Sequence, residues 1–228
     1  MEIMFDTVSL DDIRLGSEIY PFCGVTTNPS ILKANGKVDF FTHMRKIRSV
    51  IGGEKSLHIQ VTALSCEKMV AEAKWLLKNI DDQVYIKIPV TEEGLRAIRV
   101  LKAEGVHVTA TAIYMKIQGD LAVMAGADYI APYYNRMENL NINPQETIRH
   151  FADIIRQDGL PTKILAASFK NIDQVTKAYE SGAHCVTVGP ELLHTALNAA
   201  YIQGAIHDFA ADWISLYGEN TSITELPV

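Results

Sequence analysis

Lys87 is the residue of this chain whose setting points most clearly to chemistry. It stands within an apolar, β-prone run that is closed by a proline, Tyr85-Ile86-Lys87-Ile88-Pro89-Val90. A buried lysine without a partner is costly as a cation, so its pKa falls and it becomes a nucleophilic amine. Such an amine is what Schiff-base formation with a carbonyl substrate requires. The pattern also fits a lysine stem that reaches water, or an ion pair, so the rest of the chain must distinguish these alternatives.

Other β-prone runs carry polar residues whose side chains are expected, from the alternation along a strand, to point to the same side as Lys87. Counting each run with a period of two gives one inward set: Asp6, Thr26, Asn28, Gln60, Thr109, Thr111, Tyr133 and Ser168. In a parallel barrel, inward residues near the carboxyl ends of the strands face the active site. A satisfied hydrogen-bond network is the structural alternative, but eight polar groups around one lysine exceed what a plain core needs. We therefore interpret the set as an active site.

The elements that must position these residues recur along the whole chain. Short β-rich runs occur at Ile3-Phe5, Gly24-Asn28, His58-Thr62, Val84-Val90, His107-Ile113, Tyr129-Tyr134, Lys163-Ser168 and Cys185-Val188. Each is followed by a segment with helical periodicity, and Ser9, Ser65, Thr91 and Asn171 are candidate helix N-caps. This alternation predicts an α/β fold, a (β/α)8 TIM barrel with an extra C-terminal helix. An open doubly wound sheet is the alternative, but no glycine-rich dinucleotide loop follows the first run.

Composition narrows the class of protein. With 228 residues, 48% hydrophobic and 21% charged, the chain can form one sizeable core. The formal net charge of -6 gives no broad attraction to nucleic acid or to an anionic membrane. The three cysteines and seven histidines show no metal-ligand spacing, and no apolar stretch approaches the length of a membrane span. We expect a cytoplasmic protein with reduced thiols, no metal, and neither nucleic acid nor membrane as a partner.

Four phrases at strand ends carry a family resemblance. They are Gly24-Val25-Thr26-Thr27-Asn28-Pro29-Ser30, Ile86-Lys87-Ile88-Pro89-Val90, Ala131-Pro132-Tyr133-Tyr134-Asn135-Arg136 and Ala166-Ala167-Ser168-Phe169-Lys170. In this order, the chain from Met1 to about Trp213 resembles the small transaldolase and fructose-6-phosphate aldolase family. The resemblance implies a class I aldolase barrel, free of metal and of organic cofactors, in which Lys87 on the fourth strand forms the Schiff base.

Two positions indicate the branch of the family. Transaldolases resemble one another in a glutamate on strand three and a phenylalanine on strand six, where this chain has Gln60 and Tyr133, as the fructose-6-phosphate aldolase branch does. Both enzymes form a dihydroxyacetone enamine on lysine and differ in how it is discharged. A phenol at Tyr133, with Gln60 and Thr111, can hold a water and deliver a proton to the enamine, whereas phenylalanine cannot. Protonation makes the enzyme an aldolase.

The resemblance also implies roles for the remaining site residues. Asp6 is expected to orient hydroxyls and move a proton, and Asn28 to bind the dihydroxyacetone hydroxyls, with Thr26 and Thr109 beside them in the substrate site. Arg136, Ser168 and Lys170 are expected to hold the phosphate of the aldehyde half, since a guanidinium binds phosphate through two parallel hydrogen bonds. His58 departs from the phenylalanine that the aldolases tend to carry, so it is expected to affect donor preference or the catalytic water.

The C-terminal segment is predicted to lie outside the barrel repeat. We place the catalytic barrel at residues 1–200 and a C-terminal helix with a polar, extended tail at residues 201–228. Its apolar stripe fits a helix that closes over its own barrel, or an arm that packs on a neighbouring subunit. The resemblance implies a homo-oligomer, a pentamer or a decamer. Trp75 and Met124 fall at helical spacing with other apolar residues and are predicted to pack inside.

Three functions therefore remain open. The first is a lyase that reversibly cleaves fructose 6-phosphate to dihydroxyacetone and glyceraldehyde 3-phosphate. The second is a transaldolase that transfers the same three-carbon unit between sugar phosphates. The third is a sugar-phosphate-binding barrel without turnover. Trapping of a covalent adduct on Lys87 separates the first two from the third, and the ratio of transfer to cleavage separates the enzymes.

Overall fold

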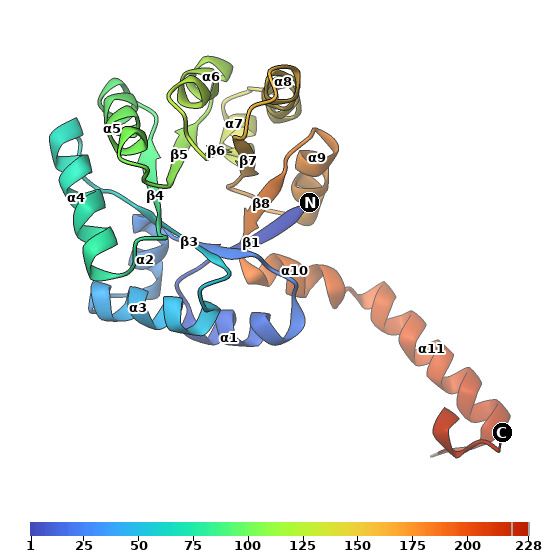
Figure 1. Ribbon diagram of the computed structural model, residues 1–228. Coiled ribbons are helices and arrows are strands. Elements are labelled where there is room, and N and C mark those ends of the chain that lie inside the picture. The colour runs from blue at the N-terminus through green and yellow to red at the C-terminus, as the bar shows by residue number, and fades with distance from the viewer. Residues whose placement is uncertain (220, 228) are drawn as a thin grey trace. The chain divides into compact units, whose positions relative to one another are not determined.

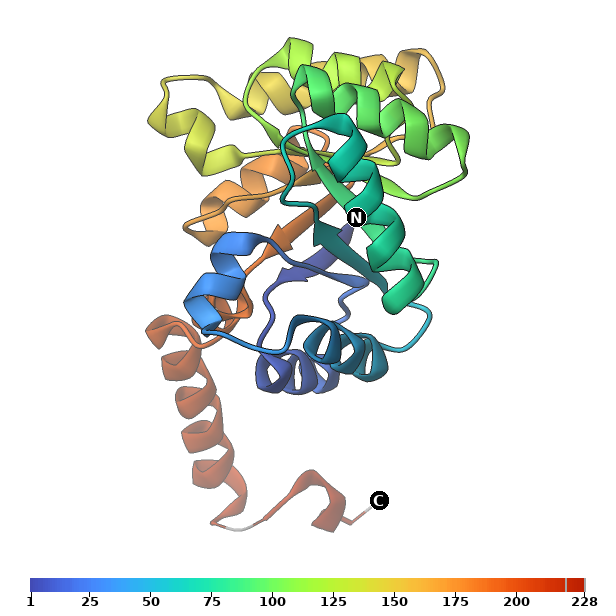
Figure 2. The ribbon, with the colours of Figure 1, turned by 90° about the vertical axis from the view of Figure 1, so that its left-hand side faces the viewer.

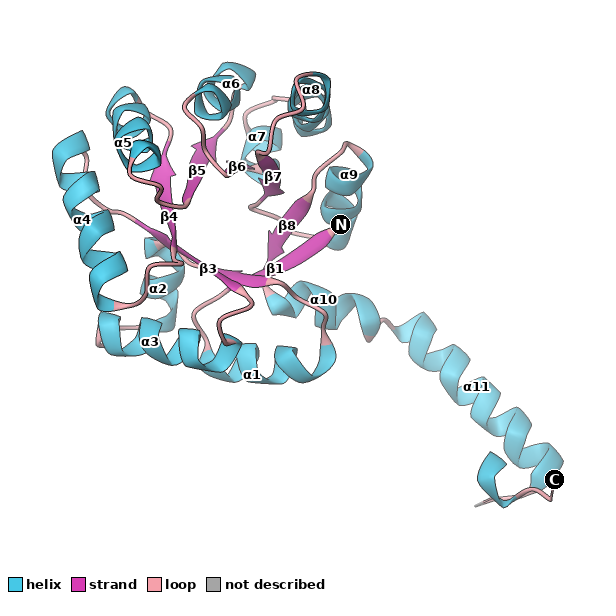
Figure 3. Cartoon of the chain, viewed as in Figure 1, coloured by secondary structure: helices cyan, strands magenta, loops and turns pink. Residues whose placement is uncertain are grey.

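Residues 1–219 and 221–227 are described by the structure, a computed structural model. The chain divides into two compact units, Met1–Pro190 and Glu191–Val228. In the first unit, eight strands pair in chain order from β1 to β8 and close into a barrel, with helices around its outside (Figures 1 and 3). All the strand pairs are parallel. The predicted (β/α)8 barrel is therefore confirmed.

Each β-rich run of the sequence overlaps one strand. The strands are β1 (Glu2–Asp6), β2 (Gly24–Thr26), β3 (Ser56–Gln60), β4 (Tyr85–Pro89), β5 (Val108–Ile113), β6 (Tyr129–Pro132), β7 (Lys163–Ala166) and β8 (Cys185–Val188). Because helices cover the outer face and side chains fill the inner one, both faces of most strands are buried. This is why most of the runs read as nearly continuous apolar sequence with single polar residues inserted.

The helices of the first unit follow the strands. They are α1 (Leu10–Ile19), α2 (Pro29–Asn35), α3 (Phe40–Ile51), α4 (Cys66–Asn79), α5 (Glu92–Ala103), α6 (Lys116–Met124), α7 (Tyr134–Asn139), α8 (Pro144–Gln157) and α9 (Ile172–Glu180). The side chains of Ser9, Thr91 and Asn171 each accept a backbone N–H three residues ahead, as N-caps do. Ser65 occupies the N-cap of α4 without such a bond. Helices α1 and α3 pack side by side on the outside of the barrel, at its lower edge in the view of Figure 2.

Two details differ from the sequence prediction. Two helices, not one, follow both β2 and β6, so Arg136 lies on the short helix α7. The side chains of Trp75 and Met124 are 55% and 82% exposed, so the prediction that both pack inside was wrong. Helical spacing identifies a face of a helix, but it does not establish that another element covers the face.

Close packing of α5 fixes the strand that carries Lys87. Ile86 and Ile88 are fully buried on the helix side of β4. Gly94, in the first turn of α5, lies so near the end of this strand that a Cβ atom there would be 1.9 Å from the carbonyl oxygen of Pro89. A Gly94→Ala substitution would push the helix away from the strand end. The absence of a side chain at this position therefore supports the placement of Lys87.

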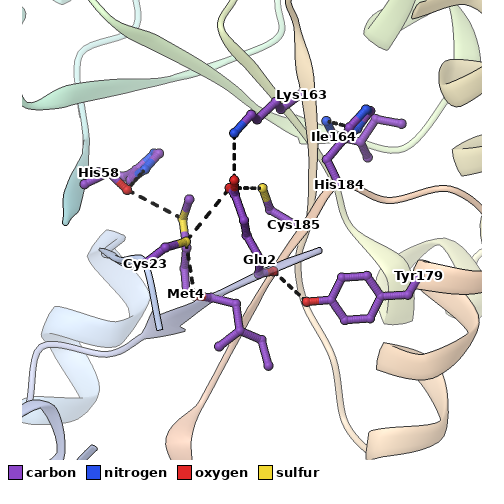
Figure 4. A network of polar contacts seen from close by, with 11 residues as sticks. Glu2, Met4, Cys23, His58, Lys163, Ile164, Tyr179, His184 and Cys185 are labelled. Atoms are coloured by element: carbon purple, nitrogen blue, oxygen red, sulfur yellow. Dashed lines mark hydrogen bonds and ion pairs between the residues drawn. The ribbon is translucent and has the colours of Figure 1, made fainter. Parts of the chain in front are cut away.

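A polar network closes the amino-terminal end of the barrel (Figure 4). The Glu2 carboxylate accepts from Lys163 Nζ at 2.8 Å and from Cys185 Sγ at 2.9 Å, and its carbonyl accepts from the Tyr179 hydroxyl. Burial raises the pKa of the Cys23 thiol to about 11 and raises that of Cys185 as well, and both cysteines are free thiols. Protonated thiols are poor nucleophiles and poor metal ligands, so this end of the barrel serves as structure.

The second unit is mainly helical. Helix α10 (Pro190–Leu197) crosses the boundary between the units, and α11 (Ala200–Tyr217) and the 3-10 turn η1 (Ile223–Glu225) follow. The Trp213 indole donates to the carbonyl of Thr221 at 2.6 Å and packs on the ring of Tyr217. A tail that is extended throughout was therefore a wrong prediction for residues 223–225, while residues 220 and 228 lie outside the described ones. In the described residues, no helix has the length and apolar character to cross a membrane.

Candidate active site

Lys87 is the third of the five residues of β4, and its side chain lies inside the barrel. The lysine is only 5% exposed, and its Nζ donates a hydrogen bond of 2.9 Å to the carbonyl oxygen of Thr27, just past β2. Burial lowers the pKa of the Lys87 amine, and the charge of Asp6 opposes this effect. The neutral, nucleophilic form is therefore more populated near pH 7 than in an ordinary lysine.

Asp6 ends β1 and stands near this amine. In the parallel register its Cα partner is Thr26, whose hydroxyl donates to Asp6 Oδ1 at 2.7 Å. Asp6 is half-buried, whereas Thr26 is fully buried beneath it. The carboxylate can thus accept a proton from a substrate hydroxyl, while Thr26 supports the carboxylate.

A second pair of hydroxyls lies on the opposite wall. The Tyr133 and Thr111 hydroxyl oxygens are 3.0 Å apart. The β5–β6 register shifts between Ala110 and Ile113, and Ala112 has a φ of 59°, so an irregularity in β5 sets the direction of Thr111. Burial raises the pKa of the Tyr133 phenol, which therefore keeps its proton at neutral pH. A protonated phenol is a group that can donate to an enamine carbon or to a water beside it.

Arg136 lies beside this phenol on α7. Its guanidinium carbon is 4.9 Å from the centre of the Tyr133 ring, a cation–π distance, and its Nη1 donates to the Tyr114 hydroxyl at 3.1 Å. This hydrogen bond is the main cause that raises the pKa of Arg136, which remains a cation. These two contacts are with uncharged phenol groups, so they leave the positive charge of Arg136 available to an anionic ligand.

The residues after β7 are arranged less uniformly. Ser168 adopts a φ of 65°, a left-handed conformation that is uncommon for a residue other than glycine, and its carbonyl accepts from the N–H of Asn135. Strained backbone of this kind is frequent at functional sites. Lys170 has an exposed side chain, and its backbone N–H donates to Gln174 Oε1. Ser168 is thus tied to the start of α7, while Lys170 extends into solvent.

Asn28 has a structural task that its sequence context did not reveal. It is the N-cap of α2, and its Oδ1 accepts from the N–H groups of Ser30 and Ile31 at 3.0 and 3.1 Å. Only the amide NH2 group of Asn28 is left to bind a substrate hydroxyl. Gln60, at the end of β3, is the Cα partner of Lys87 and is half-buried.

Two expected substrate-binding residues lie in a fully buried tier. His58 Nδ1 and Thr109 Oγ1 are 2.8 Å apart, and His58 Nε2 is 2.9 Å from Ser56 Oγ. The imidazole also stacks on the ring of Tyr85 with a centroid distance of 4.6 Å. Burial, together with the charge of Lys87, lowers the pKa of His58 well below its usual value. The ring is therefore neutral, and its nitrogens bond to protein hydroxyls instead of facing the barrel mouth.

A cavity of about 660 Å³ lies against the residues that end β2 and β3. Thr27, Asn28 and Gln60 line it, and aromatic and aliphatic side chains form most of the remaining wall. Its acidic residue Glu72 accepts hydrogen bonds from the N–H groups of Thr62 and Ala63. An apolar cavity with a carboxylate does not suit a phosphate group. A phosphate is better placed on the side of Arg136.

Sequence reasoning missed three groups of the site. The carbonyl of Thr27 left no signal in the residue pattern because any residue supplies it. Tyr114 follows β5 directly and reaches Arg136, and Thr187 of β8 contacts Thr26. The period-two count, extended to the eighth run, would have indicated Thr187. Among the described residues, no group of three His, Cys, Asp or Glu side chains is arranged to hold a metal ion.

Comparison with known proteins agrees with this geometry. A family model described as Transaldolase/Fructose-6-phosphate aldolase matches residues 3–220. A protein of Streptococcus pneumoniae (strain ATCC 700669 / Spain 23F-1) named "Probable fructose-6-phosphate aldolase" is 50% identical over 213 residues, which cover 93% of this chain and 96% of that protein. Because the family model matches nearly the whole chain, the chain belongs to the transaldolase and fructose-6-phosphate aldolase family.

Proposed function

We propose that this protein is a class I aldolase that reversibly cleaves fructose 6-phosphate to dihydroxyacetone and glyceraldehyde 3-phosphate. The observation that carries the proposal is Lys87, an amine inside the barrel with a lowered pKa and with Asp6 near it. The name of the Streptococcus pneumoniae relative supports the lyase over other members of the family. The sugar phosphate is held without a metal or an organic cofactor.

The cleavage half-reaction uses Lys87 and Asp6. The neutral amine attacks the ketose carbonyl and loses water to give an iminium, which accepts electrons as the bond between the third and fourth carbons breaks. The proton of the hydroxyl on the fourth carbon passes to the Asp6 carboxylate, and glyceraldehyde 3-phosphate leaves. Arg136 and Ser168 hold its phosphate, with Lys170 adding positive charge nearby. The amide of Asn28 binds a hydroxyl of the three-carbon unit that stays on Lys87.

The discharge half-reaction decides between lyase and transferase. The enamine on Lys87 is protonated from the Tyr133 phenol, or from a water held by Tyr133, Thr111 and Gln60. The proton that Asp6 took up during cleavage then restores this donor through water, and hydrolysis of the iminium releases dihydroxyacetone and the free Lys87 amine. The raised pKa of Tyr133 supports this role because the phenol keeps its proton until it is needed. Without that proton, the enamine would survive to attack a second aldehyde, which is the transaldolase reaction.

Trapping tests the chemistry at Lys87. Borohydride with dihydroxyacetone should add one reduced three-carbon unit to the protein, and peptide mass spectrometry should place it on Lys87. The Lys87→Met variant should take up none. A wild-type protein without an adduct would refute the aldolase and favour a binding barrel.

A phenylalanine pair tests the fate of the enamine. Tyr133→Phe removes the hydroxyl 3.0 Å from Thr111 but keeps the ring beneath Arg136, so cleavage should fall by about 10²-fold or more while transfer to erythrose 4-phosphate falls less. Tyr114→Phe is the matched control because it removes the neighbouring phenol that contacts Arg136. It should leave the ratio of transfer to cleavage unchanged. An unchanged ratio in Tyr133→Phe would contradict the proton-delivery role.

The assembly is part of the proposal. Large apolar side chains of α11, among them Phe209 and Leu216, are 72% and 76% exposed, which supports a homo-oligomer in which α11 packs on a neighbouring subunit. The family resemblance, not the exposure, is the reason for proposing a pentamer or a decamer. A cytoplasmic location fits the free thiols. Light scattering of the purified protein tests the assembly, and a monomeric mass would contradict it.

A further inference from the structure

Three side chains from adjacent strands form a chain of hydrogen bonds beneath the barrel mouth. Thr26 on β2 and Thr187 on β8 flank β1 on its two sides, and their hydroxyl oxygens are 2.6 Å apart inside the barrel. Thr26 Oγ1 is also 2.7 Å from Asp6 Oδ1. Both threonines are almost fully buried, at 0% and 2% exposure. Asp6 therefore rests on two stacked hydroxyls that lie out of reach of bulk water.

Counting protons fixes the direction of these bonds. An ionised carboxylate only accepts hydrogen bonds, so the single hydroxyl proton of Thr26 must point to Asp6. The contact between Thr26 and Thr187 then needs the proton of Thr187, which donates to Thr26 Oγ1. Hydrogen bonds in such a chain polarise one another, and a bond to a charged acceptor is among the stronger ones. The far hydroxyl thus strengthens the bond that Asp6 receives.

We propose that Thr187 is a positioning residue for the aldol cleavage, because it orients the Thr26 hydroxyl that holds the Asp6 carboxylate toward the substrate. The inference rests on the proposed function, in which Asp6 accepts the proton of the hydroxyl on the fourth carbon. Thr187 is 2% exposed, and its hydroxyl bonds to that of Thr26. It acts only through Thr26, so its loss changes the rate of bond cleavage more than the binding of the sugar phosphate.

The test compares Thr187→Val with Thr187→Ser. Valine keeps the shape of threonine but has no proton to donate, whereas serine keeps the hydroxyl. Thr187→Val should lower kcat for fructose 6-phosphate cleavage about tenfold and leave KM within twofold. Thr187→Ser should retain kcat within about threefold. If valine at this position prevents folding, the comparison of Thr187→Ala with Thr187→Ser gives the same decision.

Thr162→Val is the control for a purely structural loss. Thr162 is 4% exposed and donates to the carbonyl of Ala127 at 2.8 Å, next to the amino-terminal end of β7. Thr162→Val should lower the thermal unfolding midpoint, as Thr187→Val is also expected to do. The kcat of Thr162→Val should stay near that of the wild type. In a Thr26→Val background, Thr187→Val should have no further effect on kcat, since the relay is already broken.

The outcomes separate this inference from the proposed function. A wild-type protein that forms no borohydride-trapped adduct on Lys87 would refute the aldolase itself. A wild type that is trapped and turns over, together with an unchanged kcat in Thr187→Val, would overturn the positioning role alone. A decrease of kcat in Thr187→Ser as large as that in Thr187→Val would also overturn the positioning role. The same holds if the decreases of kcat in Thr26→Val and Thr187→Val multiply in the double variant.

Discussion

Replacing Lys87 with methionine should change the free energy of unfolding by an amount that depends on pH in a defined direction. Burial lowers the pKa of Lys87 in the folded state, while in the unfolded chain lysine titrates near its usual value of about 10.4. Between these two pKa values the unfolded chain binds a proton that the folded protein does not. The contribution of Lys87 to the free energy of unfolding of the wild type therefore rises with pH through this window, by up to about 1.4 kcal/mol per pH unit.

The sign follows from which state holds the proton. The stabilising contribution of Lys87 to the free energy of unfolding is complete above the pKa that Lys87 has in the unfolded chain. It is lost as pH falls from that value to the pKa that Lys87 has in the folded protein. Lys87→Met has no titrating group at this position. The free energy of unfolding of the variant minus that of the wild type should therefore fall as pH rises through the window. Above about pH 10.4 only the lost hydrogen bond to the Thr27 carbonyl remains, and the variant should be less stable by about 1 kcal/mol.

Urea unfolding followed by circular dichroism from pH 7 to pH 11, at one protein concentration, measures this difference. Other titrating groups are common to both proteins and cancel in the subtraction. Lys68→Met, at an exposed position on α4, is the matched control and should give a curve parallel to that of the wild type. If the Lys87→Met curve is also parallel over the whole range, Lys87 titrates alike in both states. The account of a buried, activated amine would then be refuted.

Three further predictions concern the residues around the amine. His58→Phe should lose less stability than the wild type between pH 7 and pH 5. Burial keeps the pKa of His58 well below its usual value, whereas the unfolded chain takes up a proton below about pH 6.5. Equal losses in the two proteins, measured by urea unfolding, would contradict this. Asn28→Ser should keep the unfolding midpoint, since serine also caps helices, but should raise KM for the ketose; Asn28→Ala should additionally cost about 1 kcal/mol of stability, and equal stabilities would exclude the cap. Arg136→Lys should raise KM for phosphorylated aldehydes about tenfold and leave unphosphorylated ones unchanged, and a uniform increase would argue against phosphate binding.

The fold was predictable because its signals are local and repeated. Each strand carried a short apolar run, and Ser9, Thr91 and Asn171 marked helix starts through side chains that can accept a backbone N–H. Eight such units then left few architectures open. Arg136 was less predictable, since six residues of α7 are too few to establish a helical period.

The site was predictable in direction but not in depth. A period of two shows which side chains point inward, and it grouped Thr109 with Thr111 and Tyr133. It does not show how far along the barrel axis each one lies. The structure places Thr109 in the buried tier with His58, while Tyr133 stands only partly exposed at the mouth. Register with neighbouring strands sets this level, and register depends on turns and bulges that a single sequence does not reveal.

The end of β2 shows why three consecutive residues of the motif are each constrained by a different task. The hydroxyl of Thr26 supports Asp6, the carbonyl of Thr27 accepts from Lys87, and Asn28 caps α2 through its side-chain oxygen. The cap fixes the turn out of the strand, and this turn sets the direction of the Thr27 carbonyl and thereby the position of the amine. A substitution at Asn28 that breaks the cap should therefore lower the rate of Schiff-base formation as well as substrate affinity. Asn28→Ser, which restores the cap alone, should recover the rate and not the affinity, and stopped-flow trapping with dihydroxyacetone would show whether the two effects separate.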